Sequence, residues 1–127
     1  MIILDHNIPE GQVEQLQQWR IRFRQVGYEI GRPEWDDQQE ILRYLHQAKR
    51  VTFFTRDLGF FTPRFGHANY CLVAIASPVL ETAFLIRRFL RHPDFKTRAS
   101  RMGKVVRLST TRIAYWESGR KYQQNLP

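Results

Sequence analysis

The chain has 127 residues, of which 43% are hydrophobic and 25% charged, a size and composition that suit one globular domain with a single core. The net charge is +8, and residues 87–127 alone hold 11 Lys and Arg against only Asp94 and Glu117. Such a basic segment attracts nucleic acid, the polyanion that a cytosolic domain meets most often, while solubility and docking onto an acidic partner protein are the alternatives.

The same survey excludes several classes of protein. A lone cysteine, Cys71, cannot form an internal disulfide, and its apolar neighbours predict an inert core thiol. Asp5 interrupts the first apolar run too early for a signal peptide. No apolar run approaches the roughly 18 residues that a membrane span needs. We therefore expect a soluble, cytoplasmic protein with no membrane partner.

Strand and helix patterns alternate from the start of the chain. Residues 1–4 form a short apolar strand that ends at Asp5. Apolar residues then recur at helical spacing over 10–20, directly after Pro9. Alternation of apolar and basic residues predicts a half-exposed strand over 21–27. A loop follows over 29–35.

The middle of the chain predicts one helix and two buried strands. Asp36 or Asp37 caps the helix, and its inward face carries Ile41, Leu45 and Ala48. The continuous apolar runs at 50–55 and 70–76, with a loop at 65–70 between them, are typical of strands buried inside a parallel sheet.

The last third predicts a helix from Ser77-Pro78 to His92-Pro93, followed by strands over 104–109 and 112–116 that form a hairpin. The residues expected to face inward on that helix are Leu80, Ala83, Phe84, Phe89 and Leu90. Residues 118–127 have little to fold with, so the domain should span 1–117 and end in a flexible basic tail. Alternating strands and helices predict an α/β fold with a mainly parallel sheet.

Two acids follow two of the predicted strands. Asp5 ends the first strand, and Asp57 comes within two residues of the strand that ends at Thr55. If these strands are neighbours, both carboxylates emerge at the same sheet edge and repel unless a cation lies between them. Mg²⁺ or Mn²⁺ suits such a place, because these hard ions prefer oxygen ligands.

A third acid is available at the start of the middle helix. Asp36 and Asp37 fit simple capping of that helix, where carboxylates complement the helix dipole. Glu40 does not fit a cap, and is either a site residue or an ordinary surface glutamate.

Polar neighbours of the acids suggest supporting roles. Asn7 and His6 can orient a water or a phosphate, and Thr55 can donate a hydrogen bond to a carboxylate. Arg56 can meet a phosphate, or Thr55 and Arg56 form an ordinary strand-end pair.

Aromatic and basic residues supply candidate nucleic-acid contacts. Phe60, Phe61 and Phe65, interleaved with Arg64, either stack on unpaired bases or plug the core. Three arginines share the late helix, Arg87, Arg88 and Arg91. They form an RNA track, a solvated face or a dock for an acidic segment. Tyr115 and Trp116 either make a homodimer contact or pack inward.

Three stretches together resemble the PIN-like domains, in particular the short PIN-like proteins grouped with VapC-type toxins of toxin–antitoxin modules. They are ILDHN (3–7), DDQQEIL (36–42) and FTRDLGF (54–60), and the resemblance covers about residues 1–76. It implies a parallel three-layer α/β/α sandwich and a ribonuclease that depends on Mg²⁺ or Mn²⁺. It also implies RNA as substrate and an antitoxin protein as partner.

Carried over by position, the resemblance gives Asp5, Glu40 and Asp57 as the catalytic and metal-binding acids, with Asp37 as an alternative to Glu40. Asn7, Thr55 and Asp37 then support these ligands. Family members commonly carry a further acid where this chain has Gly59.

The departure at Gly59 keeps a second hypothesis open, a catalytically reduced module that binds nucleic acid or a partner. A third hypothesis, a phosphate-accepting receiver-like domain with Asp57 as acceptor, has only the analogy of fold in its favour.

Overall fold

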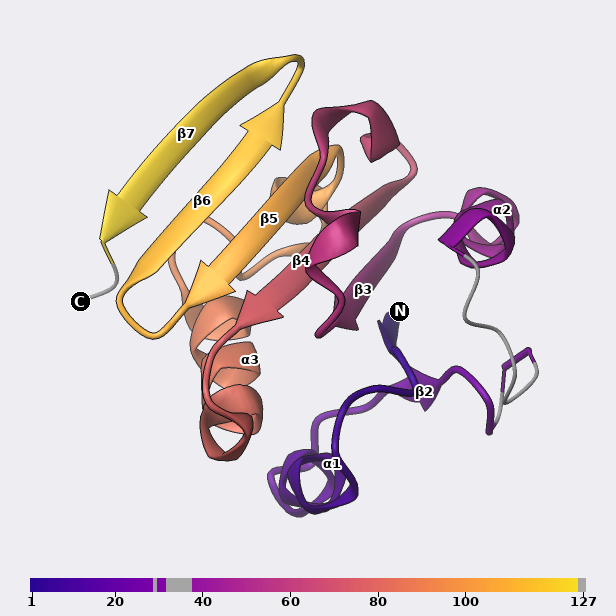
Figure 1. Cartoon of the computed structure of the whole chain (residues 1–127), viewed down its shortest axis with the longest axis vertical. Coiled ribbons are helices and arrows are strands. Elements are labelled where there is room, and N and C mark those ends of the chain that lie inside the picture. Colours follow the sequence, from indigo (N-terminus) through magenta and orange to yellow (C-terminus); the bar gives the residue numbers. More distant parts are fainter. Residues whose placement is uncertain (29, 32–37, 126–127) are drawn as a thin grey trace.

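The structure is a computed structural model that describes residues 1–28, 30–31 and 38–125. Within them, one seven-stranded sheet runs in the order β2-β1-β3-β4-β5-β6-β7 (Figure 1). Pairing is parallel from β2 through β5 and antiparallel for β6 and β7. The strands are β1 Ile2–Leu4, β2 Arg24–Gln25, β3 Val51–Thr55, β4 Tyr70–Ala76, β5 Lys104–Ser109, β6 Arg112–Glu117 and β7 Arg120–Asn125. The predicted α/β fold with a mainly parallel sheet is confirmed.

Helices pack on the sheet through two apolar clusters. One cluster receives side chains from α1 and α3, and the other receives them from α2, η1 and η2. The α-helices are α1 Glu10–Gln18, α2 Gln38–Ala48, α3 Thr82–Arg91 and α4 Arg98–Arg101, and the 3₁₀ turns are η1 Leu58–Phe60, η2 Pro63–Phe65 and η3 Val79–Glu81. The capping residues predicted for α2, Asp36 and Asp37, and most of the loop predicted over 29–35 lie outside the described residues.

The centre of the sheet is buried on both faces. All five residues of β3 are buried, and so are the first six of β4. This explains why both strands are continuous apolar runs rather than alternating ones. Cys71 lies in β4 with no exposed surface, and burial raises the pKa of its thiol to about 12. The predicted core thiol is confirmed.

The inward face predicted for α3 was partly wrong. Ala83 and Phe89 are buried as expected, but Leu80 is 84% exposed and Phe84 is 45% exposed. The reason is that Val79–Glu81 forms η3 and α3 begins only at Thr82. Leu85 and Ile86 therefore share the buried face with Ala83 and Phe89.

The end of the chain also differs from the prediction. Residues 120–125, expected to lie in a loose tail, form β7 and pair antiparallel with β6 along its whole length. Main-chain pairing and the stacking of Tyr122 on Tyr115, with ring centroids 5.1 Å apart, stabilise this edge without an apolar face. At the other edge, the strand predicted over 21–27 is reduced to β2, Arg24–Gln25.

Two further features of the described part of the chain concern its surface. None of its helices combines the length and apolar character that crossing a bilayer requires. Tyr115 and Trp116 are both partly exposed, and each packs against the core. Tyr115 joins the cluster beneath α1 and α3, and Trp116 joins the other cluster.

Two phenylalanines of α3 test the corrected helix register. Phe89 has no exposed surface and its ring stacks on Phe95 at 4.8 Å between centroids. We expect Phe89→Ala to lower the free energy of unfolding by about 3–5 kcal/mol, because it leaves a cavity in the core. Phe84→Ala, on the same helix, should cost less than about 1 kcal/mol. Urea unfolding followed by circular dichroism measures both, and equal losses would contradict the register.

Candidate functional site

Asp5 and Asp57 emerge at the same edge of the sheet. β1 and β3 are parallel neighbours with Leu4 paired to Phe54, and the Asp5 amide donates to the Phe54 carbonyl at 2.8 Å. The chain moves from β1 to β2 on one side and returns to β3 on the other, so the two acids follow the strands at the topological switch point. This is where α/β sheets place their ligand sites. The two strands are thus neighbours, which is the condition that the sequence analysis set for both acids to emerge at one edge.

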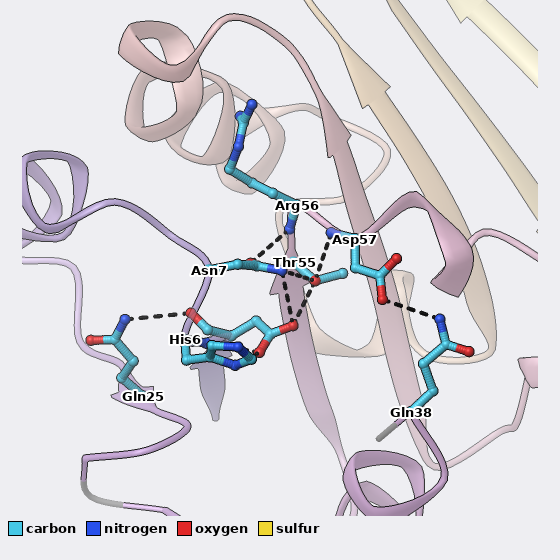
Figure 2. A network of polar contacts seen from close by, with 8 residues as sticks. His6, Asn7, Gln25, Gln38, Thr55, Arg56 and Asp57 are labelled. Carbon is cyan, nitrogen blue, oxygen red and sulfur yellow. Dashed lines mark hydrogen bonds and ion pairs between the residues drawn. The ribbon is translucent and has the colours of Figure 1, made fainter. Parts of the chain in front are cut away.

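The Thr55 hydroxyl joins the two acids. Its Oγ1 donates to Asp5 Oδ2 at 2.7 Å and accepts the amide hydrogen of Asp57 at 3.0 Å (Figure 2). Thr55 has no exposed surface, and Asp5 is only 2% exposed. A single buried side chain therefore fixes the strand end that carries Asp57 against the carboxylate of Asp5.

Asn7 completes this network from the loop after β1. Its Nδ2 donates to Thr55 Oγ1 at 3.1 Å and to Asp5 Oδ2 at 3.3 Å, while its Oδ1 accepts the Arg56 amide hydrogen at 2.9 Å (Figure 2). Sequence analysis assigned Asn7 and Thr55 supporting roles, and the structure places both in contact with the acid that they were expected to support.

The second oxygen of Asp5 faces His6. The His6 amide donates to Asp5 Oδ1 at 2.8 Å, and the ring atom Nδ1 also lies 2.8 Å from Oδ1, an ion pair when the ring is protonated. Gln25 of β2 donates to the Asp5 carbonyl oxygen at 3.4 Å. Both oxygens of the Asp5 carboxylate thus have two polar neighbours each.

Asp57 has different surroundings. Its Oδ1 accepts the Gly59 amide hydrogen at 2.8 Å, which caps η1, and its Oδ2 accepts a hydrogen bond from Gln38 Nε2 at 3.1 Å (Figure 2). The side chain is partly exposed, unlike that of Asp5. Asp57 is therefore the more accessible of the two carboxylates.

The residue of α2 that reaches Asp57 is Gln38 and not the predicted Glu40. Glu40 lies in the same first turn but is exposed, because two residues along an α-helix rotate a side chain by about 200°. No group of three His, Cys, Asp or Glu side chains among the described residues could hold a metal ion. The expected gathering of Asp5, Glu40 and Asp57 is thus not formed, and Asp37, the alternative, lies outside the described residues.

Sequence analysis missed Gln38, although a signal for it was present. Gln38 precedes the buried residues Ile41 and Leu42 by three and four positions, so it shares their face of the helix. That face points toward the sheet, and Gln38, at its first turn, comes closest to the strand ends.

The Gln38 amide packs directly against Gly59. A Cβ atom added at Gly59 would lie 2.4 Å from Gln38 Nε2 and 3.0 Å from Asp57 Oδ1. A side chain at position 59 would therefore have to displace the Gln38 amide. The departure noted at Gly59 and the amide at position 38 are linked by packing.

Arg56 connects the site to α3. Its Nη1 donates to Thr82 Oγ1 at 2.9 Å and its Nη2 to the Ser77 carbonyl at 2.8 Å. These contacts fix the loop after β4 beside the end of β3. The guanidinium predicted to meet a phosphate is thus engaged in holding the fold around the site.

The other predicted RNA contacts are spread over two parts of the surface. Arg64 is exposed in η2, with its Cζ 5.2 Å from the centroid of the Phe65 ring. On α3, Arg87 lies 3.7 Å from the ring centroid of Trp19 and is half-buried, whereas Arg91 is exposed. Arg88, also half-buried, lies 5.4 Å from the ring centroid of Phe84.

The aromatic residues near Asp57 mostly fill the core. Phe60 is 1% exposed and Phe65 is 7% exposed, and both join the cluster beneath α2. Phe61 is partly exposed and packs against the same cluster. Of the two roles expected for these rings, plugging the core is confirmed for Phe60 and Phe65.

Of the two acids at this edge, Asp57 is the one with room for a hard divalent ion. Mg²⁺ commonly takes one or two protein carboxylates, with water and phosphate oxygens completing its shell. Asp57 accepts two hydrogen bonds from described residues, and a carboxylate offers about four acceptor positions, so it retains room for an ion. Asp5 has no such room unless one of its present neighbours moves away.

Comparison with known proteins does not assign the chain to a family. No family model matches it, and neither the curated proteins nor the solved structures contain a significant match.

Replacing Thr55 tests the bridge between the two acids. We expect Thr55→Val to lower the free energy of unfolding by about 1.5–3 kcal/mol, because it removes a charge-assisted hydrogen bond from a buried carboxylate. Thr55→Ser keeps the hydroxyl and should recover most of that loss. Guanidinium unfolding of both variants provides the measurement, and equal stability of the Val and Ser variants would show that the hydroxyl is unimportant.

Proposed function

We propose that this protein is a PIN-like ribonuclease that uses Mg²⁺ or Mn²⁺ to cleave RNA, and that it acts as the toxin of a toxin–antitoxin pair. The proposal includes the three-layer α/β/α arrangement of the PIN-like domains. Its substrate is RNA, and its partner is an antitoxin protein whose acidic residues complement the +9 charge of residues 87–127.

The observation that carries the proposal is the contact of Asp5 and Asp57 with one buried hydroxyl. Two carboxylates at the ends of neighbouring parallel strands are costly to hold together without a cation. Thr55 and Asn7 bond the Asp5 carboxylate, and Thr55 also accepts the backbone amide hydrogen of Asp57. The Asp57 carboxylate is held separately, by the Gly59 amide and Gln38. Such a fixed arrangement is what metal-assisted phosphodiester hydrolysis requires.

In this proposal, each residue of the site has its own role. Asp57 would hold the ion directly, and Asp5 would join it once one of its present neighbours moves away. The ion would supply an activated water and stabilise negative charge on the phosphodiester. Thr55 and Asn7 keep Asp5 in place, and Arg56 keeps the neighbouring loop packed against the site. Asp57, being partly exposed, is the side chain next to which the scissile phosphate binds.

A specific observation favours a second candidate, a PIN-like module that binds RNA without cleaving it. The position on α2 that contacts Asp57 carries an amide, Gln38, and a side chain at position 59 would have to displace that amide. The described residues bring two acids to the site rather than three or four, which gives less negative charge to attract a divalent ion.

Substitutions that remove the charge of each acid distinguish the two candidates. A fluorophore–quencher RNA is incubated with purified protein and Mn²⁺. We expect Asp5→Asn and Asp57→Asn each to reduce the cleavage rate at least about 100-fold, because each removes a ligand charge while keeping the shape of the side chain. Asp94→Asn, an exposed acid in the turn after α3, should retain the wild-type rate.

The controls separate nuclease activity from binding. EDTA should abolish cleavage by wild-type protein. Cleavage that survives in both Asn variants would refute the nuclease. Wild-type protein that binds RNA in EDTA but produces no cleavage with Mn²⁺ would establish the second candidate.

Gln38 offers a test that does not depend on activity. Gln38→Glu places a third carboxylate beside Asp57, and we expect Mn²⁺ to bind roughly tenfold more tightly, because affinity follows the number of ligand charges. Without metal, the added charge should destabilise the fold through repulsion of Asp57. Electron paramagnetic resonance of free Mn²⁺ measures the affinity. Gln47→Glu adds the same charge near the other end of α2, and equal affinities in the two variants would argue against an ion at Asp57.

A further inference from the structure

A groove lies along the outer side of α2. Its volume is about 750 Å³, and its walls come from α2 and from the segment that joins η2 to β4. The side chains that give it chemical character are Arg43, His46, Arg64, His67 and Tyr70. None of the described residues that line it is an Asp or a Glu.

Two arginines face this groove from opposite walls. Arg43 comes from α2 and Arg64 from η2, and both side chains are exposed. Neither forms an ion pair with another described residue, and Arg64 stays near its own neighbour, the Phe65 ring. Guanidinium groups without a carboxylate partner are available to phosphate oxygens.

Three rings lie at the other end of the groove. The His46 ring lies edge-on to His67 at 4.3 Å and to Tyr70 at 5.2 Å between centroids, while His67 stacks on Tyr70 at 5.7 Å. The Asn69 amide donates to His67 Nδ1 at 3.1 Å, and the Tyr70 hydroxyl donates to the Phe65 carbonyl at 2.6 Å. Burial raises the pKa of Tyr70 to about 12, so this hydroxyl remains a donor at neutral pH. His46 and His67 are exposed, and both lie against the buried Tyr70 ring.

The groove begins beside the candidate site. Gln39 lines it and directly follows Gln38, whose amide contacts Asp57. From Gln39 to His46 the groove follows α2 for about 10 Å, at about 1.5 Å for each residue. The opposite wall is built from the chain that leaves Asp57 through η1 and η2.

We propose that this groove binds a segment of single-stranded RNA, with Arg43 and Arg64 on its phosphates and with His46 and His67 stacked on its bases. The combination of unpaired guanidinium groups and exposed rings favours nucleic acid over an acidic peptide, which has no bases to stack. The inference deepens the proposed function, on which it rests, by naming where the RNA lies beyond the acids.

RNA binding without metal tests the groove separately from cleavage. A fluorescein-labelled (U)12 RNA is titrated with full-length protein in EDTA at several NaCl concentrations, and anisotropy is recorded. We expect the double variant Arg43→Gln, Arg64→Gln to bind at least tenfold more weakly. Loss of two phosphate contacts should also make the slope of log affinity against log salt shallower by about 1.4. The double variant Arg22→Gln, Arg24→Gln removes two exposed charges near β2 and should change both quantities much less.

Replacing a ring provides a second, uncharged test. His67→Ala should weaken binding at least about fivefold, because it removes a stacking surface. Circular dichroism verifies that each variant is folded. Groove variants that bind like wild type, while wild-type protein cleaves RNA with Mn²⁺, would refute the groove and leave the nuclease standing. Weakened binding in these variants without any cleavage by wild type would support the groove and refute the nuclease.

Two further outcomes overturn the proposal. Wild-type protein that fails to bind (U)12 at low salt has no RNA groove. A poly-glutamate peptide that binds more tightly than (U)12, and loses that affinity in the Arg43→Gln, Arg64→Gln variant, would show that the groove takes acidic protein instead.

Discussion

The hydroxyl of Thr55 is the group on which the geometry of the candidate site depends. A hydroxyl has one hydrogen to donate and two lone pairs to accept with, and Thr55 uses all three, for Asp5, Asn7 and the Asp57 amide. Because the side chain is fully buried in β3, these contacts do not compete with water. The relative position of two loops that are 50 residues apart in the sequence is thus set by one side chain.

The same network makes the two carboxylates unequal. Asp5 is buried and surrounded by donors, which stabilises its charge but leaves little of it to act on a ligand. Asp57 is partly exposed and has only the Gly59 amide and the Gln38 side chain as described hydrogen-bond donors. Asp5 therefore contributes a fixed negative charge at the strand end. Asp57 is the carboxylate that a substrate or an ion would contact first. A hydrogen bond from a neutral amide costs less to displace than an ion pair, so Gln38 does not close the site.

The features that could be predicted from the sequence are those that a local pattern of residues determines. The ends of β1 and β3 were predictable, because an acid directly after a buried apolar run can only lie at the strand end. Their adjacency followed from the rules for α/β sheets. The register of α3 was not predictable in the same way. Its sequence offers apolar residues on more than one face, and η3 decides which of them are buried. Likewise β7 carries no apolar pattern, because pairing of its backbone with β6 stabilises it instead.

The residue of α2 that contacts Asp57 was also difficult to predict from the sequence. Three polar or acidic residues in a row, Gln38, Gln39 and Glu40, begin α2, and charge alone favours Glu40. The helix phase selects Gln38, because only that residue shares the face of Ile41 and Leu42. Chemical type alone thus favoured Glu40, whereas helical periodicity identifies Gln38 as the residue that contacts Asp57.

Charge shows how far sequence position and spatial position can diverge. The excess of basic residues lies in 87–127, and this segment first suggested an RNA-binding surface. In the fold, however, Arg87 is half-buried against Trp19. Arg101 is buried, and its guanidinium donates to Thr52 and to the Phe95 carbonyl. Lys104 forms an ion pair with Glu117. Part of the basic excess thus serves packing. The exposed arginines of the groove along α2 come instead from the first 86 residues, whose formal charge is −1. Net charge along a chain indicates that a polyanion is attracted, but the location of its binding site depends on which guanidinium groups the fold leaves without a partner.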